Sequence, residues 1–147
     1  MKSRTKARGI ALQVLYEVDI STHKPGIVLA KRFENLKMDD SLKHFISNIV
    51  SGVVANKKKF DEFLADFAPD WPLDQVAIID RNLLRMVFWE IAVYQKTPIK
   101  VVVNEVVELA KLYGADGSAR FVNGVLGGLI ENLEEIKSNV GIVQDSD

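Results

Sequence analysis

The amino-acid sequence predicts an all-helical fold in a single domain. Apolar residues return every three or four positions along most of the chain, which places them on one face of an α-helix. No segment sustains the alternation of apolar and polar residues that is typical of a half-buried strand. With 147 residues, 48% of them hydrophobic, the chain has the size of one domain with its own core. We therefore expect a single-domain seven-helix bundle.

The N-terminal half contains four segments with helical spacing of the apolar residues. Pro25-Gly26 and Asp39-Asp40 separate the first three segments, and Pro69 follows the fourth. Ser3 precedes the first apolar stripe and is suited to cap that helix. The four expected helices cover approximately residues 3–19, 26–36, 40–54 and 57–67.

The C-terminal half predicts three more helices, over approximately residues 73–95, 98–113 and 118–136. The helix at 98–113 is apolar around most of its circumference, which predicts a place in the middle of the core. Ser118 is suited to cap the last helix. We expect a helical domain over residues 1–137 and a disordered acidic tail over residues 138–147.

The composition limits the classes of function. The chain has no cysteine, which excludes disulfides, thiolate zinc sites and cysteine nucleophiles, and a fold without covalent cross-links suits the reducing cytoplasm. No stretch approaches the roughly 20 apolar residues that a membrane span needs. We therefore expect a cytoplasmic protein that is neither secreted nor inserted in a membrane.

The sequence lacks the usual signatures of catalysis and metal binding. Its two histidines, His23 and His44, have neither the spacing nor the carboxylate companions of a metal site. Metalloprotease, nucleophile-elbow and phosphate-loop motifs are missing as well. The glycines at 124, 127 and 128 lie inside a helical pattern, where close helix packing is the simplest explanation. We expect no catalytic residue, no metal and no cofactor.

The charges are unevenly distributed although they nearly cancel to a net charge of −1. Four cations lie within the first eight residues, and the first acid is Glu17. On a helical wheel Tyr16 falls outside the apolar face, on the side of this basic segment. Cations for phosphates and a ring for a base are what single-stranded RNA binding requires. The alternative is a solvated basic N-terminus with Tyr16 packed on the next helix.

Two residues of the C-terminal half stand out. Phe121 lies at the edge of the last apolar stripe, beside the glycine-containing loop at 114–118, and an aromatic there is either core or an exposed ring. Asp80 lies at the centre of an apolar stripe. It either caps a helix that restarts there or lies on a face that a partner covers.

Three charged residues need a partner in the helical pattern. Arg81 and Arg85 precede Trp89 at four-residue spacing, which permits an arginine to stack on the indole. Glu105 falls inside the apolar arc of its helix and must be paired or lie near the edge; Arg85 is a suitable partner.

Three blocks and the N-terminal helix resemble the NusB family. The blocks are DRNLLR at 80–85, PIKVVVNEVVELAK at 98–111 and FVNGVL at 121–126. The N-terminal segment from Arg4 to Tyr16, with ALQVLY at 11–16, is similar to the first helix of that family. The resemblance covers nearly the whole chain, from about residue 3 to residue 133, and the NEVVELAK and FVNGVL blocks in this order are specific.

The resemblance implies a transcription antitermination factor with the fold of a seven-helix bundle. Proteins of this family bind the boxA element of nascent RNA, including ribosomal RNA, as a heterodimer with the ribosomal protein NusE. Carried over by position, the RNA-binding residues are Lys2, Arg4, Lys6, Arg8, Gln13, Tyr16 and Phe121. The partner-binding residues are Asp80, Arg81 and Asp116. Other antitermination factors and RNA polymerase would be indirect partners, and a homodimer stays open.

Two alternatives remain at this point. RNA methyltransferases of the cytosine-5 kind carry a NusB-like domain, but they also need a cofactor-binding domain, for which this sequence has no room. The other alternative is a helical adaptor that binds only proteins, and deletion of residues 1–8 would leave its function intact.

Overall fold

The computed structural model describes residues 2–67, 75–134 and 138. These residues form helices and no strand, which confirms the all-helical prediction. The elements are α1 (Ser3–Ile20), α2 (Pro25–Phe33), α3 (Asp40–Phe67), α4 (Ile78–Phe88), the π-helix η2 (Trp89–Tyr94), α5 (Ile99–Tyr113) and α6 (Ser118–Glu131). The expected acidic tail falls on residues that, except for Ser138, lie outside the described part.

The prediction of two helices at 40–54 and 57–67 is wrong, because α3 runs through both segments. Asn56 lies at the expected break, yet its side chain is buried and its Nδ2 donates to the Gly52 carbonyl at 2.9 Å. The polar side chain is thus satisfied one helical turn back, within the helix itself. This continuity reduces the expected seven helices to six α-helices in the part of the chain that the structure describes.

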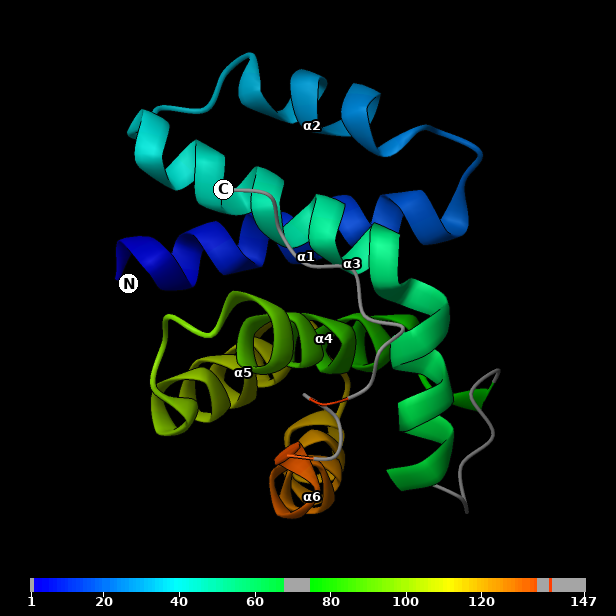
Figure 1. Ribbon diagram of the computed structural model, residues 1–147. Helices are drawn as coiled ribbons and strands as arrows, with labels where there is room; N and C mark the ends of the chain where they lie inside the picture. Colours follow the sequence, from blue (N-terminus) through cyan, green and yellow to red (C-terminus); the bar gives the residue numbers. More distant parts are fainter. Residues whose placement is uncertain (1, 68–74, 135–137, 139–147) are drawn as a thin grey trace.

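The helices form two layers (Figure 1). One layer holds α1, α2 and the first part of α3; the other holds α4, α5 and α6, and the rest of α3 runs beside it. The central helix is α4, which packs against α1, α3, α5 and α6 and buries every residue from Asn82 to Phe88. The prediction that α5 occupies the centre is wrong, since Val101 and Leu112 are about half exposed. Its apolar circumference is wider than the surface that its neighbours cover.

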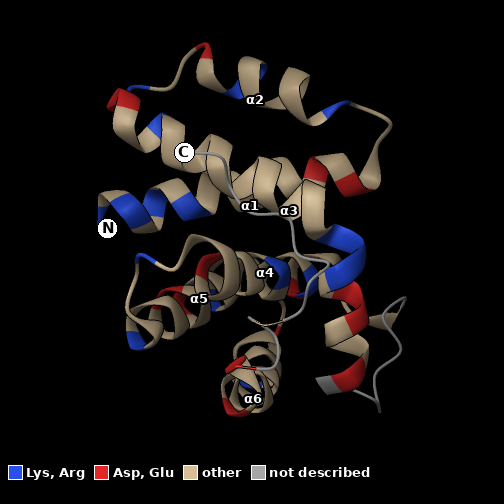
Figure 2. Ribbon diagram, viewed as in Figure 1, with Lys and Arg blue, Asp and Glu red and all other residues tan. Residues whose placement is uncertain are grey.

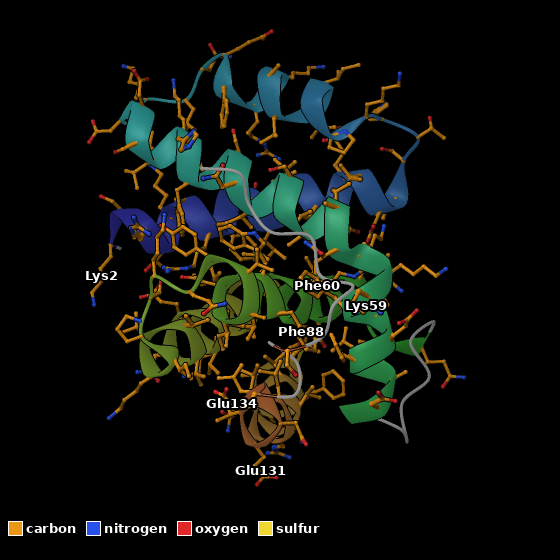
Figure 3. All side chains as sticks on the ribbon, in the orientation of Figure 1. Lys2, Lys59, Phe60, Phe88, Glu131 and Glu134 are labelled. Atoms are coloured by element: carbon orange, nitrogen blue, oxygen red, sulfur yellow. The ribbon has the colours of Figure 1, made fainter. Side chains whose placement is uncertain are left out.

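Aromatic side chains join α3 to α4 and η2. Figure 3 labels Phe60 of α3 and Phe88 of α4, whose rings stack with centroids 5.5 Å apart. Trp89 lies against Gly52, where an added Cβ would meet the indole Nε1 at 1.9 Å, so only glycine fits there. The Trp89 ring stacks on Tyr94, at 4.8 Å between centroids. Arg81 and Arg85, which were expected to stack on Trp89, instead contact Asp19.

None of the helices in the described ranges combines the length and the apolar composition needed to cross a bilayer.

Candidate nucleic-acid interface

The basic N-terminal segment forms the exposed start of α1. Lys2, Arg4 and Lys6 are exposed, and Figure 2 shows Lys and Arg colouring along the N-terminal part of α1. Lys2 points away from the bundle into solvent (Figure 3). The Arg4 guanidinium lies over the Phe45 ring, 4.2 Å from its centroid, which holds this cation close to the protein surface.

Arg8 does not belong to this surface, contrary to the prediction. Its side chain is 2% exposed, and its Nε and Nη2 donate to the two Glu90 carboxylate oxygens at 2.9 and 2.5 Å. Its Nη1 lies 3.6 Å from Glu105 Oε2, and Thr5 Oγ1 donates to that same oxygen. The predicted pair between Glu105 and Arg85 is therefore wrong. A helical wheel gives the angle of Arg8 but not the acids that η2 and α5 place opposite it.

A row of side chains follows one face of α1. The α1 row consists of Lys2, Lys6, Gly9, Gln13 and Tyr16, which are spaced by three or four residues. Tyr16 is 37% exposed, as the wheel predicts, and Gln13 is half-buried. Four of the seven predicted RNA-binding residues thus lie in the α1 row, namely Lys2, Lys6, Gln13 and Tyr16. Arg4 is exposed too, but on the side of α1 that faces Phe45 of α3.

Two residues that the sequence did not single out reach the α1 row from other helices. Gln13 Nε2 donates to the Tyr113 hydroxyl of α5 at 3.1 Å, and Arg32 Nη1 of α2 donates to Gln13 Oε1 at 2.8 Å. The Tyr113 ring lies beside Gly9, where an added Cβ would be 3.1 Å from the hydroxyl. A local sequence pattern cannot predict these contacts, because Gln13, Tyr113 and Arg32 come from three different helices.

The seventh predicted RNA-binding residue, Phe121, lies apart on α6. It is half-buried and packs against the core, between the two interpretations that the sequence left open. Asp116 is exposed in the loop that leads to α6. Gly124 and Gly127 have open space where a Cβ would be, so close helix packing is the wrong explanation for them. At these two positions α6 is instead exposed.

Asp80 is a buried acid with an incomplete set of partners. It lies in the first turn of α4, whose N-cap is Ala77, so it does not cap the helix. Its side chain is close to Ser118 at the start of α6, while its Oδ1 has no hydrogen-bond partner within the described residues. Burial raises the pKa of Asp80, and the hydrogen bond with Ser118 offsets only part of this increase.

Arg81 belongs to a partly buried charge cluster around Asp19. The Asp19 carboxylate lies 2.5 Å from Lys57 Nζ, 2.8 Å from Arg85 Nη1 and 3.7 Å from Arg81 Nη2. Burial by itself would raise the pKa of Asp19. Hydrogen bonds with Lys57 and Asn82, together with the charge of Arg85, outweigh burial and lower it. This cluster ties α1 to α3 and α4.

Metal ligation has no geometric support in the part of the chain that the structure describes. It holds no group of three or more histidine, cysteine, aspartate or glutamate side chains placed to bind an ion. His23 and His44 are both exposed, and His23 Nδ1 is 3.0 Å from Glu17 Oε2.

Known proteins are similar to this chain in sequence and in fold. The model of the NusB family matches residues 5–131. The transcription antitermination protein NusB of Roseiflexus sp. (strain RS-1) is 39% identical over 134 residues, covering 90% of this chain and 94% of that protein. The one from Dehalococcoides mccartyi (strain CBDB1) is 42% identical over 134 residues, covering 90% and 93%.

Solved structures agree with these relatives. The NusB of T. maritima superposes with a TM-score of 0.80 at 25% identity, covering 87% of this chain and 90% of that one. A chain from a crystal structure of antitermination factors NusB and NusE in complex with dsRNA gives 0.79 at 26% identity, covering 89% and 98%. This chain belongs to the NusB family.

Proposed function

We propose that this chain is a transcription antitermination factor that binds boxA-type single-stranded RNA together with the ribosomal protein NusE. The observation that carries the proposal is the exposure of Lys2, Arg4 and Lys6 at the start of α1 and of Tyr16 farther along the same helix. Relatives named as antitermination proteins and the similarity to a NusB chain in a complex with NusE and dsRNA support it.

In this proposal the cations and the ring have different tasks. Lys2, Arg4 and Lys6 neutralise phosphates, and Tyr16 supplies a face on which one base stacks. With Arg8 neutralised by Glu90, the patch has three cations on a molecule of net charge −1. Few counterions are then released on binding. Affinity for RNA is accordingly modest for the chain alone and increases when a basic partner extends the patch.

The partner site is assigned to the junction of α4 and α6. Asp80 carries a buried carboxylate oxygen without a hydrogen-bond partner in the described residues, and its negative charge suits a basic ribosomal protein. Arg81 is the next residue of α4, Asp116 lies in the loop before α6, and Phe121 lies in the first turns of α6. Other antitermination factors and RNA polymerase are reached through the complex.

We infer that the protein works by binding and performs no catalysis, in the cytoplasm where transcripts emerge. The site assembles cations, an amide and aromatic rings, and these groups hold RNA without a nucleophile activated by a base. An RNA cleavage or methyl-transfer assay with purified protein is expected to give background. Activity that co-purifies with the protein and disappears on a point substitution would overturn this inference.

A charge-matched pair of variants tests the RNA surface. The first replaces Lys2, Arg4 and Lys6 by glutamine; the control replaces Lys24, Lys37 and Lys58, which are exposed elsewhere. Both variants change the net charge equally, so only the first is expected to weaken binding of boxA RNA, with and without NusE. If the first variant is folded, still binds NusE and holds the RNA like the parent, the adaptor alternative replaces this proposal.

A further inference from the structure

The α1 row has a gap at its centre when only α1 is considered. Lys2 and Lys6 precede Gly9, and Gln13 and Tyr16 follow it. A glycine inside a helix has no side chain to offer a ligand and costs helix stability. Gly9 is nevertheless buried, which means that something covers it.

Tyr113 of α5 covers this gap. Its ring approaches Gly9 so closely that a Cβ at position 9 would lie 3.1 Å from the hydroxyl and 3.4 Å from Cε2. Tyr113 is still 40% exposed, so the residue remains accessible to solvent beside the row. Because Gly9 has no side chain, the Tyr113 ring can lie directly over this position of the row, between Lys6 and Gln13.

Arg32 adds a cation to the same row from α2. Its Nη1 donates to Gln13 Oε1 at 2.8 Å, while Gln13 Nε2 donates to the Tyr113 hydroxyl at 3.1 Å. All three side chains lie at the protein surface, where such bonds contribute little to stability because water offers equivalent partners. Their common effect is to fix a guanidinium and a ring at defined positions on either side of Gln13.

We propose that Tyr113 is a second base-stacking ring and Arg32 a further phosphate contact of the RNA surface, both aligned by Gln13. The inference rests on the proposed function and extends it. Tyr113 at Gly9 and Tyr16 are seven residues apart along α1, which is about 10 Å along the helix axis. Two rings at this separation, with cations before and between them, suit two unstacked bases of one single strand.

The ring is tested with Tyr113→Ala against Leu112→Ala, its neighbour on α5, which is exposed. The probe is a single-stranded boxA RNA oligonucleotide, titrated with and without NusE. Tyr113→Ala is expected to weaken binding roughly 5- to 150-fold, as loss of a stacked base does, and Leu112→Ala by less than about twofold. Tyr113→Leu keeps an apolar side chain over Gly9 but cannot stack, so the same loss is expected. An affinity retained by both Tyr113 variants would overturn the assignment of the ring.

The cation is tested with Arg32→Gln against Lys31→Gln, which removes an equal charge from the adjacent exposed position of α2. A phosphate contact is revealed by the salt dependence of binding. Arg32→Gln is expected to reduce the slope of log K against log salt by roughly 0.7, the value for one phosphate of a single strand, and Lys31→Gln to leave it unchanged. Equal slopes for the two variants would overturn the assignment of Arg32.

Tyr16→Ala separates this inference from the proposed function. If Tyr16→Ala weakens RNA binding and neither Tyr113→Ala nor Arg32→Gln does, the α1 surface stands and the extension is wrong. If none of the three weakens binding while circular dichroism shows folded proteins, the RNA surface itself is misplaced.

Discussion

Asp19 of α1 and Asp80 of α4 have largely buried side chains in opposite surroundings. Asp19 is surrounded by Lys57, Arg81 and Arg85, and its pKa is lowered. Asp80 has an oxygen without a partner in the described residues, and its pKa is raised. Because a buried charge is tolerated only when it is paired, the difference separates an acid that is paired within the fold from one that keeps an unpaired oxygen in the described residues.

Arg8 is also a charge that is paired within the fold, and its removal is expected to have the largest effect on stability. Arg8→Ala leaves Glu90 buried, at 2% exposure, and without its main cation. Breaking a buried pair on one side costs about 3–5 kcal/mol of unfolding free energy. Urea unfolding of Arg8→Ala and of Arg4→Ala measures this, and Arg4→Ala is expected to cost less than about 1 kcal/mol. Equal stabilities of the two variants would mean that the pair of Arg8 with Glu90 does not stabilise the fold.

Asp19→Asn is the next largest change. It removes the charge that Lys57 and Arg85 share, although Arg85 keeps Asp61 through two bonds of 2.7 and 2.8 Å. The expected loss is therefore about 3 kcal/mol, at the lower end for a buried pair. Thermal unfolding at pH 7 measures it, with the exposed Asp39→Asn as the control. A midpoint equal to that of the control would contradict the pairing argument.

Asp80→Asn is expected to act on the partner instead of on the fold. The amide removes a charge that burial disfavours, so the unfolding midpoint at pH 7 should stay the same or rise. A hydrogen bond from a cationic NusE group to the carboxylate would be lost, which weakens binding by about 1.5–3 kcal/mol. Calorimetric titration with NusE measures this. A large loss of stability together with unchanged NusE binding would assign Asp80 to the fold.

The two aspartates should also respond oppositely to acid, which is the smallest effect. The stabilisation from Asp19 is complete above its unfolded pKa near 3.8 and is lost as the pH falls through its lower folded pKa. The raised pKa of Asp80 means that the folded state takes up its proton more readily, so protonation there adds stability as the pH falls towards 3.8. Midpoints measured from pH 7 to pH 3 should therefore show a small gain that Asp80→Asn abolishes, followed by a loss that Asp19→Asn reduces. The same curve in all three proteins would contradict both shifts.

The sequence by itself determined the helical class, because the 3–4 spacing of apolar residues reports which face of each segment is buried. It also placed Tyr16 outside the apolar face, located the cluster of cations at the N-terminus and showed the anomaly of Asp80, but it left open whether Tyr16 packs on the next helix. These features depend on residues close together in one segment. A wheel of α1 is enough to place Tyr16 off the apolar face, whereas its exposure also depends on the helices packed beside α1.

Only the tertiary structure decided which charges are neutralised and which helix is central. Arg8 and Glu90 are 82 positions apart, and Gln13 and Tyr113 are 100 apart. No periodicity within a segment contains such pairs, because they depend on how the layers are stacked. For the same reason α4, and not the more apolar α5, is the helix that neighbours surround. The position of a charge along a helix is a local property, whereas its availability to RNA depends on the acids that distant segments bring to it.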